Sequence, residues 1–266
     1  MDQPPTARAH YVREPAPWVG GCSDIGRRHH TNQDALAIAV RTGPTPAAVI
    51  AVADGVSTAQ GSERASMVAA DTVVAALLDQ RTAGAGVEDA FAGAFAAANE
   101  AVLAAHDAPS ACTLIAAAVD DGAITVGSVG DSRAYWVGDD GAAHQLSTDD
   151  SMAQARILLG MSRDEAERSI QAHALTKWLG RQSTDATPSL VRYRPDGPGW
   201  LLLCSDGLWN YASEPEALAS IVAELAPRST GPGDLAEALT VWANGQGGRD
   251  NVTVILARIV EVCGSD

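Results

Sequence analysis

The stretch WLLLCSDGLWN (residues 200–210) places an apolar run directly before an Asp-Gly pair. The run from Trp200 to Cys204 has the length and composition of a buried strand, and it ends abruptly at Ser205, Asp206 and Gly207. Asp-Gly is an ordinary turn signal, so one instance predicts only a strand followed by a turn. The same arrangement recurs elsewhere in the chain, which raises the question of whether these acids meet.

Other short apolar stretches, each bounded by Gly, Asp, Pro or Asn, also predict strands. They are ALAIAV (35–40), AAVIAVA (47–53), CTLIAAAV (112–119), AITVGSV (123–129), RAYWV (133–137), SLVRY (189–193) and VTVILARIV (252–260). Helical patterns lie between them. They cover 61–80, 87–108, 215–226, 233–244 and a shorter segment, 162–170, where Ser162 and Glu165 can form a capping box. Helices come in pairs and strands in runs, which predicts an α+β fold with antiparallel sheets and helices packed outside.

Composition narrows the class of protein. The chain has 266 residues and a formal net charge of −15, which argues against nucleic acid and against an anionic membrane as partners. No apolar run approaches the ~20 residues of a membrane span. We expect a flexible tail over residues 1–17 and one domain over 18–262. The four cysteines lack a CxxC spacing, which is typical of reduced thiols in a cytoplasmic protein.

Four aspartates stand where predicted core strands begin or end. Asp54 follows AVIAVA, Asp131 separates two strands, Asp206 follows WLLLC, and Asp250 immediately precedes the last strand. Each could be a turn residue alone. If the strand ends meet at one edge of the core, however, four carboxylates crowd together, and like charges that close need a cation. Mg²⁺ or Mn²⁺, hard ions that prefer oxygen ligands, would satisfy them.

With these segments in order, the chain resembles the metal-dependent serine/threonine phosphatases of the protein phosphatase 2C family, in a bacterial-like form. The motifs that carry the resemblance are SDIGRRHHTNQDA (23–35), VADGVSTAQGSERAS (52–66), CTLIAAAV (112–119), VGDSRAYWV (129–137), LSTDDS (146–151), LTKWLG (175–180), LLLCSDGLW (201–209) and GRDNVTVIL (248–256). Each motif is weak alone, and their order and spacing together are specific. The resemblance implies a four-layer α-β-β-α sandwich with a metal site at one edge.

The resemblance also implies metal ligands. Asp54 corresponds to the ligand that bridges two core ions, and the Gly55 carbonyl to a ligand of the second ion. Asp206 and Asp250 correspond to ligands of the first ion. Asp131 matches the position that, with Asp206, holds a third and weaker ion in many bacterial members.

The implied reaction is direct attack of a metal-bridged water on phosphoserine or phosphothreonine, without a phosphoenzyme. Asp34 matches an acid near the second ion that acts through water, and it joins Asp54, Asp206 and Asp250 as a catalytic residue. Gln33, Asp34 and Asn251 are expected to surround the ligands. The expected partners are phosphoproteins, including a kinase or a regulator, and we expect a monomer.

Three positions depart from the family pattern. An arginine that holds the substrate phosphate is usual where this chain has His29, and the adjacent Arg28 is an alternative. Both are expected phosphate-binding residues, although a loop histidine without a role explains His29 equally well. The usual Glu before Asp34 is Gln33 here, and Val56 stands in the region where some relatives have a general-acid histidine.

A rival reading belongs to another class of protein. A phosphatase-fold module could bind a phosphoprotein without cleaving it, and His29 and Gln33 favour that reading. The four aspartates argue against it, because buried carboxylates are costly without their ions. Residues 150–174 match the mobile flap of the family and carry three arginines that could contact a substrate protein or simply face solvent.

Overall fold

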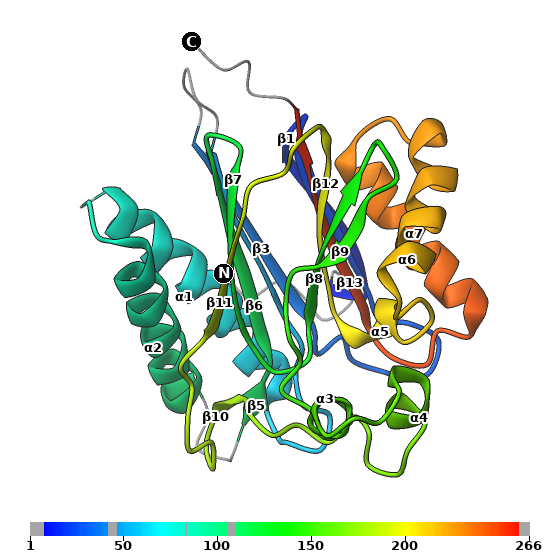
Figure 1. Ribbon diagram of the computed structural model, residues 1–266. Coiled ribbons are helices and arrows are strands. Elements are labelled where there is room, and N and C mark those ends of the chain that lie inside the picture. Colours follow the sequence, from blue (N-terminus) through cyan, green and yellow to red (C-terminus); the bar gives the residue numbers. More distant parts are fainter. Residues whose placement is uncertain (1–7, 42–46, 83, 106–109, 261–266) are drawn as a thin grey trace.

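Strands rich in alanine and β-branched residues form two sheets that face each other in the computed structural model, which describes residues 8–41, 47–82, 84–105 and 110–260 (Figure 1). The six-stranded sheet has the order β1 (His10–Ala16), β2 (Val19–Asp24), β13 (Val252–Ile259), β12 (Gly199–Cys204), β8 (Arg133–Gly138) and β9 (Ala143–Gln145). The five-stranded sheet has the order β11 (Ser189–Tyr193), β7 (Ala123–Val129), β6 (Leu114–Asp120), β4 (Ala47–Ala53) and β3 (Ala35–Arg41). A separate antiparallel pair joins β10 (Leu179–Gly180) to β5 (Ala111–Cys112).

Helix pairs cover the outer faces of both sheets (Figure 1). The five-stranded sheet is covered by α1 (Ser62–Thr82) and α2 (Val87–Ala105), and the six-stranded sheet by α6 (Pro215–Leu225) and α7 (Pro232–Gln246). Shorter elements are α3 (Met152–Leu158), α4 (Arg163–Glu167), α5 (Asp206–Trp209) and the 3₁₀ helix η2 (Ala226–Arg228). This arrangement confirms the predicted α-β-β-α sandwich. In the described part of the chain, no helix combines the length and the apolar character that crossing a membrane requires.

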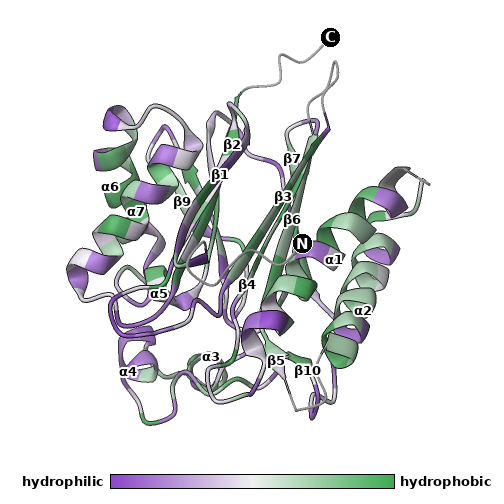
Figure 2. Cartoon of the chain, turned by 180° about the vertical axis from the view of Figure 1, so that it is seen from behind, coloured by the Kyte–Doolittle hydropathy of each residue, from purple (hydrophilic) through white to green (hydrophobic). Residues whose placement is uncertain are grey.

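Strand β4 shows how the core is divided. All seven of its residues are buried, because helices cover one face of its sheet and the second sheet covers the other. Val49 and Ala51 pack toward α1 and α2, whereas Ile50 and Val52 pack between the sheets, as the two-residue period of a strand requires. Figure 2 shows hydrophobic colouring along inner strands such as β3, β6 and β7 and also on helices such as α2.

The prediction of a flexible tail over 1–17 is wrong for the part that the structure describes. Residues 10–16 form β1, which pairs antiparallel with β2 at the edge of the six-stranded sheet. The guanidinium of Arg8 is buried and donates to the carboxylate of Glu63 and to the carbonyl oxygen of Asp34. An edge strand with polar residues and a proline resembles a loop in sequence. Residues 1–7 and the expected boundary at 262 lie outside the described residues.

The cysteines agree with the prediction of reduced thiols. Cys22, Cys112 and Cys204 are buried and free, each within an apolar cluster. Cys263 lies outside the described residues. The predicted strand 112–119 is interrupted at Thr113, which separates the short β5 from β6. This interruption positions a hydroxyl group beside Asp54, as described next.

Candidate active site

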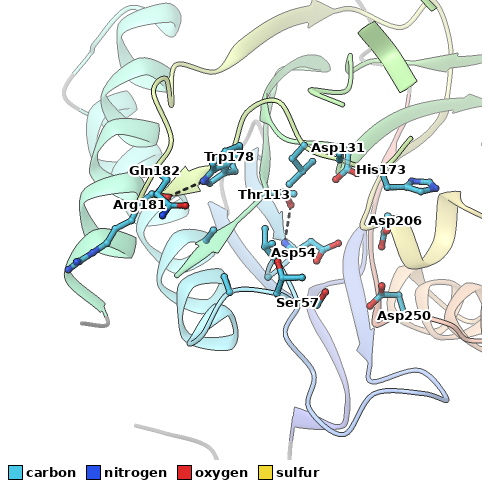
Figure 3. A pocket seen from close by; sticks show the side chains of 17 residues that line it. Asp54, Ser57, Thr113, Asp131, His173, Trp178, Arg181, Gln182, Asp206 and Asp250 are labelled. Atoms are coloured by element: carbon cyan, nitrogen blue, oxygen red, sulfur yellow. Dashed lines mark hydrogen bonds between the residues drawn. The ribbon is translucent and has the colours of Figure 1, made fainter. Parts of the chain in front are cut away.

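The strand ends bring Asp54, Asp131, Asp206 and Asp250 to one edge of the sandwich, where all four line a cavity of about 650 Å³. Asp54 follows β4, Asp131 lies between β7 and β8, Asp206 begins α5 after β12, and Asp250 precedes β13. Figure 3 shows the four carboxylates grouped on one side of this cavity. The structure therefore brings together the four acids that the strand pattern singled out.

Thr113 connects the Asp54 turn to the Asp131 turn. The Asp54 amide donates to Thr113 Oγ1 at 3.1 Å, and the Thr113 amide donates to the Asp54 carbonyl oxygen at 2.8 Å (Figure 3). Thr113 Oγ1 also shares a hydrogen bond of 2.8 Å with Ser132 Oγ. Gly130 has φ = +102°, and a Cβ there would lie 2.7 Å from the Thr113 side chain, so this turn requires glycine.

Gly55, directly after Asp54, has no side chain, and the packing around it leaves no room for one. A Cβ at this position would lie 2.7 Å from the carbonyl oxygen of Gln33 and 2.8 Å from that of Ser62. The Gln33 side chain donates to Ser62 Oγ in α1, and Gln33 is absent from the residues that line the cavity. Gln33 is thus held beside the site by α1, because its side-chain amide already donates a hydrogen bond to Ser62.

Asp34 is buried beneath the cavity, with only 1% of its surface exposed. Its Oδ2 accepts hydrogen bonds from Ser205 Oγ at 2.7 Å and from Thr253 Oγ1 at 2.8 Å. Burial raises the pKa of Asp34 to about 6, although these two hydrogen bonds oppose the rise. Ser205, directly after β12, and Thr253, in β13, thereby fix the orientation of this carboxyl group.

Asp206 carries the least satisfied atom of the site. Its Oδ2 accepts a hydrogen bond from Asn210 Nδ2 at 3.1 Å, but its buried Oδ1 has no partner within the described chain. Burial first, and then the charges of Asp131, Asp250 and Asp34, raise the pKa of Asp206 well above its usual range. A buried oxygen without a donor is costly, and a cation would satisfy it.

Asp54 and Asp131 experience the same electrostatic conflict. Burial raises the pKa of Asp54 well above its usual range, and the neighbouring aspartates raise it further. Burial raises the pKa of Asp131 to about 7, with Asp149 adding to the rise. In the described residues, no three His, Cys, Asp or Glu side chains are already arranged around a single point as a ligand set. The carboxylates nevertheless fit divalent cations in chemistry, because they are oxygen donors that repel one another.

Asp250 and Asn251 connect the site to the loop after β2. Asp250 Oδ1 lies 3.2 Å from His29 Nε2 and accepts the Asn251 amide at 2.8 Å. Asn251 Oδ1 accepts the Gln33 amide at 2.8 Å, and its Nδ2 donates to the Ile25 carbonyl oxygen at 2.8 Å. Asn251 therefore braces this edge of the site.

The two residues predicted to bind phosphate lie apart from the cavity lining. The His29 ring is engaged with Asp250, and Arg28 is exposed. Neither is among the residues that line the cavity. Sequence reasoning missed several residues that do line it, namely Ser57, Thr58, His173, Trp178, Arg181 and Gln182. The motif LTKWLG marked part of this wall, but nothing in the sequence placed it opposite the carboxylates.

The contribution of Asp34 and Asp131 to the stability of the metal-free protein is expected to fall as pH rises from about 4 to about 7. The carboxyls of Asp34 and Asp131 have folded-state pKa values of about 6 and about 7, above the ordinary value of 3.8. The folded state therefore keeps protons in this window that the unfolded chain has released, so ionisation favours unfolding. Bound cations remove the penalty by pairing with the ionised groups.

Thermal unfolding with Mn²⁺ and with chelator checks this expectation. The gain in Tm from the cation should be larger at about pH 8 than at about pH 5.5. Comparing Mn²⁺ with chelator at the same pH cancels the contributions of titrating groups outside the site. A gain that is equal at both pH values, or larger in acid, would contradict the expectation.

Comparisons with known proteins agree on one family. The sequence profile of "Protein phosphatase 2C" matches residues 25–242. A serine/threonine phosphatase stp from Listeria innocua is 30% identical over 146 residues, which is 54% of this chain and 55% of that protein. Protein phosphatase PhpP from Streptococcus pneumoniae is 32% identical over 150 residues, covering 56% of this chain and 58% of that protein. The chain thus spans little more than half the length of these relatives.

A solved structure extends the similarity over nearly the whole chain. The catalytic domain of the serine/threonine protein phosphatase PstP, crystallised with two manganese ions, superposes with a TM-score of 0.68 and 25% identity. The superposition covers 95% of this chain and all of that one. The sandwich fold is therefore shared along the full domain.

Proposed function

We propose that this chain, which belongs to the protein phosphatase 2C family, hydrolyses the phosphate monoesters of phosphoserine and phosphothreonine in proteins. The observation that carries the proposal is the cluster of Asp54, Asp131 and Asp206, with the unpartnered Oδ1 of Asp206. Such a cluster is unfavourable alone and favourable around divalent cations. The phosphatase relatives and the manganese-bound neighbour support the same reaction.

The donor set suits Mn²⁺ or Mg²⁺, because all of its donors are oxygen atoms. In this proposal Asp54, Asp206 and Asp250 would hold one core ion, and Asp54 and the Gly55 carbonyl would hold the second. Asp131 and Asp206 would hold a third, weaker ion. When bound, the ions supply positive charge that lowers the pKa of water and neutralises the phosphoryl oxygens.

The protein positions the reacting groups. Ser205 and Thr253 orient the Asp34 carboxyl group beside Asp54, where it would accept a proton from the attacking water. Asn251 holds the Asp250 segment against the loop after β2, so that the ligand carboxylates keep their places. The hydroxyl groups of Ser57 and Thr58 line the cavity near Val56, where some relatives have a histidine.

His29 is proposed to bind the substrate phosphate from the rim, beside Asp250. His29 Nε2 lies 3.2 Å from Oδ1 of Asp250, which lines the cavity, and Arg28 is a more exposed alternative. We expect His29→Ala to raise the KM for p-nitrophenyl phosphate by about three- to tenfold with kcat nearly unchanged, as the loss of one polar contact predicts. Steady-state kinetics of Arg28→Ala, measured in parallel, shows which of the two residues binds the phosphate. An unchanged KM in His29→Ala would exclude phosphate binding by His29.

The proposed setting is the cytoplasm, with phosphorylated proteins such as a kinase or a regulator as substrates. The free, buried thiols of Cys22, Cys112 and Cys204 support a reducing compartment. The net charge of −15 supports protein substrates over nucleic acids. We propose that the chain acts as a monomer.

Hydrolysis of p-nitrophenyl phosphate and of a phosphothreonine peptide tests the proposed function directly. We expect turnover with Mn²⁺ or Mg²⁺ and none with chelator, because the carboxylate cluster depends on cations for its charge balance. The rates should saturate with cation concentration. A folded protein that binds Mn²⁺ but turns over neither substrate would instead be a module that binds phosphoproteins without cleaving them.

A further inference from the structure

The cavity has a second wall that the hydrolysis itself does not use. Trp178, Arg181 and Gln182 line it in the segment around β10, on the side away from Asp206 and Asp250 (Figure 3). The cavity therefore extends well beyond the space that a phosphoryl group occupies. A substrate chain that places its phosphorylated residue at the aspartates can also run along this wall.

The wall is firmly anchored. Leu179 is fully buried in the helix-side core and pairs with Cys112, so β10 is held against β5. The Gly180 amide donates to Asn99 Oδ1 of α2 at 2.8 Å. Trp178 Nε1 donates to the Arg181 carbonyl oxygen at 3.2 Å, which closes the turn (Figure 3). The side chains that face the cavity thus start from a fixed backbone, as a recognition surface needs.

Arg181 is the one arginine or lysine among the described residues that line the cavity. It is exposed, and it forms no ion pair with any described residue, whereas the nearby Lys177 pairs with Asp185 at 2.9 Å. Figure 3 shows the Arg181 side chain extending away from the four carboxylates, beyond Trp178. Its guanidinium is therefore free to bind an anion, but at a distance from the phosphoryl position.

We propose that Trp178 and Arg181 form a peptide subsite that selects substrates with an acidic side chain flanking the phosphorylated residue. The proposal rests on the proposed function, since it takes the aspartates as the phosphoryl position. Arg181 would pair with the carboxylate, and the half-buried Trp178 ring would support the peptide between the two positions. A second phosphoryl group offers the same anionic chemistry, and the test separates the two.

Binding of non-hydrolysable peptides tests the subsite independently of turnover. Three fluorescent peptides carry a phosphonate analogue of phosphothreonine, with Glu, Gln or phosphoserine at the flanking positions, and anisotropy with Mn²⁺ gives each Kd. We expect the wild type to bind the Glu peptide about two- to fivefold more tightly than the Gln peptide, as for an exposed ion pair. Arg181→Gln should equalise the two, and Arg181→Glu should invert them.

Two further variants serve as controls. Arg228→Glu makes the same change of charge on an exposed arginine outside the cavity and should leave the preference unchanged. Trp178→Ala should weaken binding of the Glu and Gln peptides equally, because the uncharged ring does not distinguish Glu from Gln.

Absence of a Glu preference in the wild type, or its loss in Arg228→Glu, overturns the proposal. A larger, Arg181-dependent preference for phosphoserine overturns the carboxylate assignment. Absence of p-nitrophenyl phosphate hydrolysis counts against the proposed function alone, because the Kd ratios do not depend on it.

Discussion

Asp206→Asn is expected to lower cation-dependent hydrolysis by about a hundred- to a thousandfold, which is typical for the loss of one electrostatic contact to a reacting centre. The same change should raise the Tm of the protein in chelator. Asn keeps the shape of the side chain but removes a charge that raises the pKa of Asp54, and it removes the buried Asp206 carboxylate, whose own pKa is raised by burial and by its acidic neighbours. Relief of ~1 kcal/mol corresponds to about 2–4 °C for a chain of this size.

A loss of activity together with a gain in Tm distinguishes a carboxylate that binds a cation from one that only stabilises the fold. Rates with p-nitrophenyl phosphate and thermal unfolding in chelator supply the two measurements. Asp196→Asn is the matched control, since it removes one exposed charge outside the cavity. A lower Tm for Asp206→Asn in chelator would mean that this carboxylate stabilises the fold by itself, against the cation-site interpretation.

Arg133→Ala is expected to destabilise the protein by about 3–5 kcal/mol, the usual result of removing one partner from a buried ion pair. Arg133 is almost fully buried in β8, and its guanidinium contacts Asp149 at 2.7 Å and Glu167 of α4 at 3.1 Å. The same group lies 3.7 Å from the centre of the Trp209 ring. Removing Arg133 leaves the Asp149 carboxylate, also buried, without its main partner.

The chain contains a less buried pair for comparison. Arg258 also pairs with an aspartate, Asp139, and lies 5.2 Å from the centre of a tryptophan ring, that of Trp200, but the Arg258 and Asp139 side chains are 27% and 45% exposed. Arg258→Ala should therefore cost at most about 1 kcal/mol in urea unfolding. Equal losses for the two variants would contradict the importance given to burial. Because Trp209 Nε1 donates to the Asp131 carbonyl oxygen at 2.9 Å, Arg133→Ala should also weaken binding at the site.

The strand pattern predicted antiparallel sheets with helices outside and four aspartates at strand ends because both depend on local rules, whereas the four-layer sandwich was implied by the family resemblance. Strands of the inner layers are apolar on both faces, as β4 is, and their ends carry turn residues that sequence displays directly. The capping box of Ser162 and Glu165 is likewise local, and the structure confirms it. The roles of individual ligands stay predictions drawn from the family.

The features that sequence did not predict depend on distant contacts. Strand β2, VGGCSD, has few β-branched residues and is a strand because β1 and β13 pair with it on either side. Two-residue β10 exists only through its pairing with β5. Arg181 gains its position opposite the aspartates from that same pairing, so no local pattern marks it as part of the cavity.

The position of β13 affects how the protein is made. Strand β13 lies inside the six-stranded sheet, between β2 and β12, and Asp250 directly precedes it. During synthesis, the sheet that contains β2 and β12 cannot close until β13 has left the ribosome. Contacts between such distant segments also form slowly, because long loops must close first. A nascent chain therefore lacks the complete cluster of aspartates, and the proposed hydrolysis can begin only after β13 has been translated.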